Sequence, residues 1–227
     1  MYILLNMAMT ADGKIATESR KVTSFGSPRD LAHLYELRAT ADAIFCGART
    51  VEETGATLGN GGDEYTQIRL KQRLQAYPVR VVVSGEGSIS STIPLWNAHS
   101  SPIIVFTSGR ASKANLERIR KLATEVWVSP GDEIDFPEAL KWLATSYGVG
   151  RIVAEGGATL NDTLFRSHLI DELHVTICPY LAGGKNAPTL SEGKGWSRLG
   201  QATRLRLHQK SRRKGELYLV YRIQSNR

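Results

Sequence analysis

The chain has 227 residues, 41% of them hydrophobic and 22% charged, which is an ordinary composition for a globular protein. This length suffices for one domain with a sizeable buried core, and no apolar run approaches the roughly 18 residues that a membrane span needs. The net charge of +7 and the sequence pI of about 9.5 raise the question of nucleic-acid binding.

The first two thirds of the chain alternate strand-like and helix-like segments. Strands are predicted at 2–9, 43–47, 79–84, 102–107, 125–128 and 151–154, mostly as short apolar runs that end at glycine or polar residues. Helices are predicted to begin at Pro28 with Ser27 as N-cap, at about Ser112, at Asp135 and after Gly157. The segment 54–65 is rich in Gly, Thr and Asn and is expected to form a mobile loop.

The pattern changes after about residue 170. A strand is predicted at 173–179, and two alternating segments, 204–208 and 216–223, flank a turn at 210–215. The sequence therefore predicts an α/β fold with a mixed, mostly parallel sheet and a C-terminal antiparallel hairpin. We expect a single domain over residues 1–227.

Several function classes are disfavoured by what the sequence contains. Cys46 and Cys178 lie far apart in apolar runs, so we expect both to be reduced and buried, with no metal site. The start of the chain reads as a strand and not as a signal peptide, which predicts the cytoplasm. The basic residues crowd the predicted hairpin without interleaved aromatics, so a solvated edge strand is favoured over a nucleic-acid surface.

Ligands of open α/β sheets collect at the carboxyl ends of the parallel strands. The strongest signal there is Gly156-Gly157, because two glycines between a strand and a helix let backbone N–H groups approach a phosphate. The sequence is neither a P-loop nor a GxGxxG motif, and the pair could also be only a tight turn. Glu155 would repel a phosphate, so it either faces donors of a second ligand or is an exposed strand-end residue.

No GxSxG elbow and no histidine pair at metal-ligand spacing occur in the sequence. With neither a nucleophile nor a metal cluster in view, a reaction that depends on positioning, such as hydride transfer, fits best.

Several stretches together resemble the reductase domain of riboflavin biosynthesis, which occurs alone or fused behind a deaminase. These stretches follow the family's order and spacing, at residues 8–16, 37–39, 42–44, 47–51, 80–84, 155–160, 169–173 and 178–184. The resemblance implies a dihydrofolate-reductase-like three-layer fold, a homodimer and NADPH as cofactor. It also implies reduction of the ribosyl group of 5-amino-6-(5-phosphoribosylamino)uracil, or of its 2,5-diaminopyrimidinone precursor, to the ribityl form. We expect no fused deaminase domain.

The resemblance also assigns roles to individual residues. For the cofactor it implies Ala8 and Thr50 at the nicotinamide, Ser84 and Gly85 at the adenosine, and, at the pyrophosphate, Gly156, Gly157, Ala158, Thr159 and Leu160. Ser84, Ser108 and Arg110 are candidate readers of the 2′-phosphate. For the substrate the resemblance implies that Glu155, Arg38 and Ser19 position it and that Asp12 and Lys14 lie at the mouth of the site. Asp12 could equally be a turn residue.

The sequence departs from the family pattern in three places. Thr54, which we assign to the cofactor site, stands where the family usually has an acidic residue. Leu58-Gly59-Asn60-Gly61-Gly62 replaces an apolar-basic stretch that helps to hold the substrate phosphate, and Lys21 replaces a common tryptophan. A paralogous reductase acting on another pterin- or pyrimidine-like compound is therefore the alternative. A non-catalytic nucleotide- or nucleic-acid-binding protein is a distant one.

Overall fold

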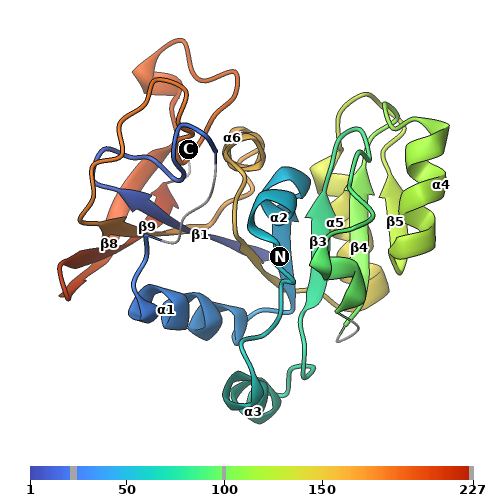
Figure 1. Ribbon diagram of the computed structural model, residues 1–227, viewed down its shortest axis with the longest axis horizontal. Helices are drawn as coiled ribbons and strands as arrows, with labels where there is room; N and C mark the ends of the chain where they lie inside the picture. Colours follow the sequence, from blue (N-terminus) through green and yellow to red (C-terminus); the bar gives the residue numbers. More distant parts are fainter. Residues whose placement is uncertain (21–24, 99–100, 225–227) are drawn as a thin grey trace. The chain divides into compact units, whose positions relative to one another are not determined.

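The computed structural model describes residues 1–20, 25–98 and 101–224, and the described residues form nine strands (Figure 1). By its contacts the chain divides into two compact units. The first consists of Met1 and Tyr35–Val153, and the second of Tyr2–Leu34 and Ala154–Arg227. Helix α1 (Pro28–Arg38) contributes its first part to the second unit and its last turn to the first.

The first unit contains a parallel sheet built from short, buried, β-branched runs. Its strands follow the order β5-β4-β3-β2-β6, with bounds Glu125–Val128, Ile103–Thr107, Val79–Val83, Ala43–Gly47 and Arg151–Ala154. The helices of this unit are α2 (Ala48–Thr54), α3 (Asp63–Lys71), α4 (Lys113–Leu122) and α5 (Phe136–Tyr147), with a 3-10 turn η1 (Pro94–Asn97). Helix α4 packs beside β5 (Figure 1).

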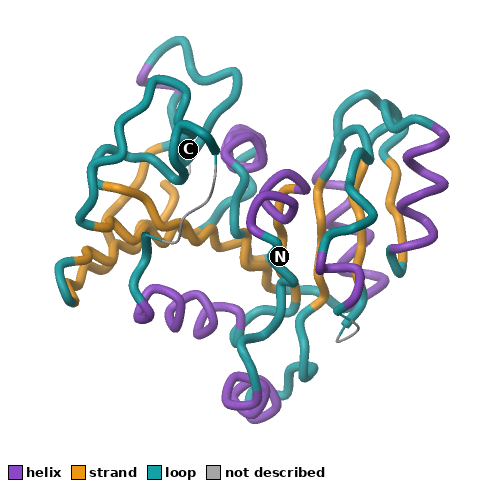
Figure 2. Tube along the Cα trace, in the orientation of Figure 1, coloured by secondary structure: helices purple, strands orange, loops and turns teal. Residues whose placement is uncertain are grey.

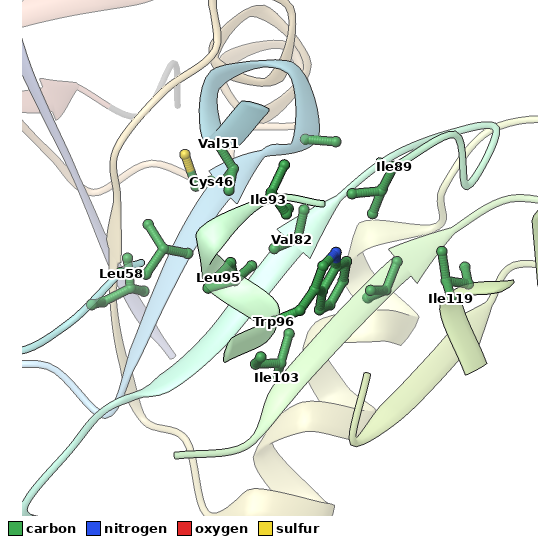
Figure 3. Close-up of a cluster of buried hydrophobic side chains, with 13 residues drawn as sticks. Cys46, Val51, Leu58, Val82, Ile89, Ile93, Leu95, Trp96, Ile103 and Ile119 are labelled. Atoms are coloured by element: carbon green, nitrogen blue, oxygen red, sulfur yellow. The ribbon is translucent and has the colours of Figure 1, made fainter. Parts of the chain in front are cut away.

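A cluster of buried apolar side chains covers one face of this sheet. Figure 3 shows Trp96 among Val82, Leu95 and Ile103, all of them at most 6% exposed. The helix starts follow local rules, because the side chains of Ser112 and Asp135 each accept a hydrogen bond from the backbone N–H three residues later.

The second unit combines parallel and antiparallel pairing. Its strands follow the order β1-β7-β9-β8, with bounds Tyr2–Thr10, Glu172–Cys178, Glu216–Gln224 and Arg204–Arg213. β1 and β7 are parallel, whereas β9 runs antiparallel to both β7 and β8. The helices are the first part of α1, α6 (Ala158–Arg166) and a 3-10 turn η2 (Leu199–Gln201) in the long connection between β7 and β8 (Figure 2).

The predicted α/β class, the mixed and mostly parallel pairing and the C-terminal antiparallel hairpin are confirmed. The predicted cap of α1 is also confirmed, because Ser27 Oγ accepts from the backbone N–H groups of Arg29 and Asp30. Both cysteines are buried and reduced, as predicted. No helix in the described ranges is long and apolar enough to cross a membrane.

The structure differs from these predictions at the hairpin turn and around the segment 54–65. The turn of the hairpin is not 210–215 but the pair Lys214-Gly215, whose φ angles of 47° and 88° suit a two-residue turn, so β8 extends to Arg213. Helices α2 and α3 were not foreseen, and together they take both ends of the predicted loop 54–65. Within that loop Leu58 and Asn60 are only 1% and 3% exposed, so its centre is packed into the unit.

Candidate active site

The Gly156-Gly157 turn joins β6 to α6 in a backbone conformation that suits glycine. Their φ angles are 95° and 89°, and a Cβ on Gly156 would lie 2.7 Å from Met7 Sδ. Gly157 is the N-cap of α6 and no side chain of the described residues caps this helix. The first-turn N–H groups of α6 are therefore available to an anion, with the positive end of the helix dipole behind them.

The start of α6 is held rigidly by the loop that follows β7. The buried Asn161 donates from Nδ2 to the carbonyl of Leu190 at 2.7 Å, and the N–H of Glu192 donates to the carbonyl of Ala158 at 3.0 Å. Glu155 is half-buried at the strand end, Thr159 is exposed on the first turn, and Leu160 is buried beneath it. This start of the helix is thus preorganised.

Four further candidates lie on β1 or on the segment that follows it, in the same unit. Ala8 is the register partner of Thr176 on β7. The Asp12 carboxylate accepts hydrogen bonds from Thr10 Oγ1 at 2.6 Å and from the backbone N–H groups of Ala182 and Gly183 at 3.1 and 2.7 Å. These donors, Thr10 first, lower the pKa of Asp12 to about 2. Asp12 therefore joins two loops, which favours its interpretation as a structural turn residue.

Lys14 makes a second link between these loops, because its Nζ donates to the carbonyl of Ala187 at 3.0 Å. The hydroxyl of Ser19 lies 3.1 Å from that of Thr17. Lys21, the position of the common tryptophan, lies outside the described residues.

In the first unit, the predicted adenosine residues meet at the carboxyl ends of β3 and β4. Ser84 donates its N–H to Phe106 at 2.9 Å, and Ser108 Oγ donates to the carbonyl of Gly85 at 2.6 Å. Arg110 stands beside them, since a Cβ on Gly85 would lie 2.9 Å from its Nη2. Its side chain is 52% exposed and only 3.9 Å from Glu86 Oε1, so it can still turn toward an anion.

Helix α2 carries the two threonines assigned to the cofactor. Thr50 is half-buried on the helix, and Thr54 is its last residue. Thr54 Oγ1 donates a hydrogen bond to the carbonyl of Thr50 at 2.7 Å, so this carbonyl in the last turn of the helix has a partner.

Arg38 is more deeply placed than a substrate-facing arginine was expected to be. It is 6% exposed, its Nη1 donates to the carbonyl of Gly59 at 2.5 Å, and its guanidinium lies 5.4 Å from the Tyr35 ring centroid. The fully buried Arg69, which sequence reasoning missed, donates to the carbonyls of Arg38 and Ala41, both at 2.6 Å. Arg38 and Arg69 together fix the end of α1 and the loop that departs from the family pattern.

A buried polar network beneath the start of α1 was also missed. Glu216 is 3% exposed and accepts from the N–H and hydroxyl of Ser27 at 2.7 and 2.6 Å and from the Tyr218 hydroxyl at 2.5 Å. Burial alone would raise the pKa of Glu216, but these hydrogen bonds outweigh it and lower the pKa. For Asp30, burial raises the pKa, a hydrogen bond from Thr176 opposes the rise, and the charge of Glu216 adds to it.

Two of the histidines, His33 and His174, lie far apart in the sequence but side by side in the structure. His33 Nε2 lies 3.3 Å from His174 Nδ1, and His174 Nε2 lies 2.7 Å from Glu172 Oε1. His174 is thus a buried residue whose two ring nitrogens both have hydrogen-bond partners. Within the described ranges no group of three or more His, Cys, Asp or Glu side chains could hold a metal ion.

Comparison with known proteins agrees with this arrangement. Residues 1–219 match the RibD C-terminal domain family. The chain is 35% identical over 208 residues to the 2,5-diamino-6-ribosylamino-4(3H)-pyrimidinone 5′-phosphate reductase of Methanothermobacter thermautotrophicus, covering 91% of this chain and 90% of that protein.

Among solved structures, a pyrimidine reductase-like protein from Corynebacterium diphtheriae is similar with a TM-score of 0.85 at 21% identity, covering 99% of this chain and 92% of that one. The dihydrofolate reductase of Enterococcus faecalis, complexed with NADP(H), is similar with a TM-score of 0.52 at 15% identity, covering 98% and 96%. The dihydrofolate-reductase-like fold is thereby confirmed, and the chain belongs to the RibD C-terminal domain family.

Proposed function

We propose that this chain is an NADPH-dependent reductase of riboflavin biosynthesis. It reduces the ribosyl group of a 5′-phosphorylated ribosylaminopyrimidine, either the 2,5-diaminopyrimidinone or its deaminated uracil counterpart, to a ribityl chain. Family membership and the name of the Methanothermobacter relative support the reaction and the substrate class.

The turn at Gly156-Gly157 is the observation that carries the proposal. Both glycines have positive φ, they precede a helix that no described side chain caps, and Met7 leaves no room for a Cβ on Gly156. Such a turn suits the close approach of a pyrophosphate to backbone N–H groups. We therefore assign it, with Ala158, Thr159 and Leu160, to the pyrophosphate of the dinucleotide.

The fold points to a nicotinamide cofactor, and we propose that it is NADPH. Arg110 is exposed next to Ser84 and Gly85, and an arginine suits the extra 2′-phosphate that distinguishes NADPH from NADH. Thr50 and Thr54 on α2 and Ala8 on β1 are assigned to the same cofactor by the family pattern.

When bound, NADPH supplies the hydride, and the protein's own task is to orient and shield the reacting groups. Reduction at the C1 carbon of the opened sugar requires donor and acceptor carbons to be held in line while water is kept out. We assign substrate positioning to Glu155 and Arg38, with Lys14 and Ser19 on the segment after β1. The loop contacts of Asp12 and Lys14 keep that segment in one conformation.

The test is direct. Loss of NADPH absorbance is followed with the purified chain and each of the two ribosylaminopyrimidine phosphates, and the product is identified by mass. Turnover of either compound, with NADPH preferred over NADH, is expected. Tight NADPH binding without turnover of either would favour a paralogous reductase, and failure to bind NADPH would refute the proposal.

We also propose that the chain forms a homodimer through the hairpin. Leu205, Leu207 and Leu217 lie on one face of the β8–β9 pair and are 40–46% exposed, and β8 is exposed along its whole length. Apolar side chains gathered on an exposed sheet face mark an interaction surface, so a second copy is its natural cover. Replacing Leu205 and Leu207 by Ser should convert a dimer into a monomer in light scattering; a wild-type monomer would refute the dimer.

A further inference from the structure

Arg80 is a buried cation whose two hydrogen-bond acceptors are both neutral carbonyls. It is the one polar residue of β3 and shares a face with Val82 of the buried apolar cluster, because alternate residues of a strand point the same way. Its side chain is only 1% exposed. Nη1 donates to the carbonyl of Thr57 at 3.4 Å, and Nη2 donates to the carbonyl of Ser101. A buried charge without a counter-ion is costly.

The guanidinium of Arg80 has donors left over. Its Nε is buried and has no hydrogen-bond partner within the described ranges. Each Nη nitrogen carries two hydrogens and uses one of them on a carbonyl. Burial lowers the pKa of Arg80 to about 10, and no charged group in the described part of the chain opposes this. Since buried polar groups normally have partners, Arg80 is suited to one further acceptor that carries a negative charge.

A cleft of about 300 Å³ is lined by Arg80. Part of its wall is apolar and comes from Trp96, Ile103 and Leu122; the first two lie side by side in Figure 3. Thr124 also lines the cleft. Its hydroxyl oxygen accepts from the N–H of Ile103 at 3.0 Å, so its own hydrogen can be donated to a ligand. The cleft thus combines an apolar wall, a hydroxyl donor and a buried cation.

This cleft lies at the opposite edge of the sheet from the residues assigned to the adenosine of the cofactor. Arg80 is the second residue of β3, Ile103 is the first residue of β4, and Thr124 comes directly before β5. Ser84 and Gly85, in contrast, follow the carboxyl end of β3. Because β3, β4 and β5 are parallel, the cleft lies at their amino ends and is separate from these residues.

We propose that this cleft binds a small organic monocarboxylate, with its carboxylate on Arg80 and its apolar body against Trp96 and Leu122. A carboxylate matches the planar guanidinium and can accept from two of its N–H groups. One negative charge balances one buried cation, whereas a phosphate dianion would leave a buried charge in excess. The volume is at the lower end of the range for ligand pockets, so the ligand is small. The site does not depend on the proposed reductase activity.

Benzoate and benzamide test the proposal on the wild-type chain, because they have nearly the same shape and differ in charge. Each compound is titrated into the protein by calorimetry or by ligand-observed NMR. We expect benzoate to bind about tenfold or more tightly than benzamide, since hydrogen bonds to a charged carboxylate are stronger than those to a neutral amide. Equal binding of the two compounds, or no binding of benzoate, would overturn the proposal.

The Leu122→Trp variant fills the cleft and leaves Arg80 unchanged. Leu122 is the last residue of α4 and is half-buried, so the helix can carry a larger side chain there. Benzoate affinity should fall about tenfold or more, because the added ring occupies the space of the ligand. Wild-type affinity in this variant would show that benzoate binds elsewhere and would refute the assignment of the cleft.

Arg80→Met removes the charge, and Arg69→Met is its matched control. Arg69 is also fully buried and binds backbone carbonyls, but it does not line the cleft. Benzoate affinity should fall about 10- to 100-fold in Arg80→Met and keep its wild-type value in Arg69→Met. An equal fall in both variants would trace the loss to the fold and contradict the proposal. Thermal unfolding shows whether each variant is folded; if either arginine variant is not, Leu122→Trp and the benzamide comparison decide.

Discussion

Replacing Glu216 by Gln is expected to lower the free energy of unfolding by about 2–4 kcal/mol. The carboxylate is buried and accepts three hydrogen bonds of 2.5–2.7 Å from Ser27 and Tyr218. A hydrogen bond to a charged group contributes about 1.5–3 kcal/mol and one between neutral groups about 0.5–1.5 kcal/mol. Each of the three hydrogen bonds to Glu216 should therefore lose roughly 1 kcal/mol when the carboxylate becomes a neutral carboxamide. The carboxamide also turns an NH₂ group toward groups that are themselves donors, while relief of the repulsion with Asp30 offsets part of the loss.

Denaturant unfolding at neutral pH measures this change, and the thermal midpoint should fall by roughly 6–12 °C for a chain of this size. Glu125→Gln is the matched control, because Glu125 Oε2 also accepts a tyrosine hydroxyl, that of Tyr147 at 2.9 Å, but in an exposed setting. Its effect should stay below about 0.5 kcal/mol. If Glu216→Gln is as stable as Glu125→Gln, the buried network does not hold α1 in place and the reasoning is refuted.

Three further outcomes are expected. Gly157→Val should weaken NADPH binding by about tenfold or more in a fluorescence titration, whereas Gly148→Val, strained at φ 66° but in open space, should lower stability only. Glu155→Gln should lower kcat and leave NADPH affinity unchanged. A wild-type rate would show that Glu155 is only a residue at the end of a strand and does not position the substrate. The folded-state pKa of Asp12, about 2, is below its ordinary value of 3.8. The charged carboxylate therefore stabilises the folded state fully above about pH 4, and this stabilisation is lost as the pH falls through about 2. Wild type and Asp12→Asn should therefore differ in thermal midpoint at neutral pH and converge in acid; a constant difference would contradict this.

The elements with strong local signals could be predicted from the sequence. Buried strands such as β3 and β4 are runs of β-branched residues ended by polar ones, and Ser27-Pro28 marks the start of α1. The Gly156-Gly157 turn was found for the same reason, since its conformation depends on the two glycines themselves.

Elements without a local signal were missed. Gly47 and Gly62 precede α2 and α3 and neither provides a side-chain cap, so the strongest local signal of a helix start is missing at both. Two of the carbonyls that Arg69 binds lie 28 and 31 residues away, and its role depends on the fold that brings them together. A buried arginine that binds backbone carbonyls looks like any surface arginine in the sequence.

The start of α1 shows why one buried part of the structure was beyond sequence reasoning. The helix buries only Leu37 and Arg38, both in its last turn, so apolar packing does not fix its first turns. Their position depends on hydrogen bonds between Ser27 and Glu216, which are 189 residues apart. Hydrogen bonds are directional, so they specify one placement of the helix more narrowly than apolar contact would. A pattern of neighbouring residues could therefore predict that a helix begins at Pro28, but not which buried carboxylate holds its start.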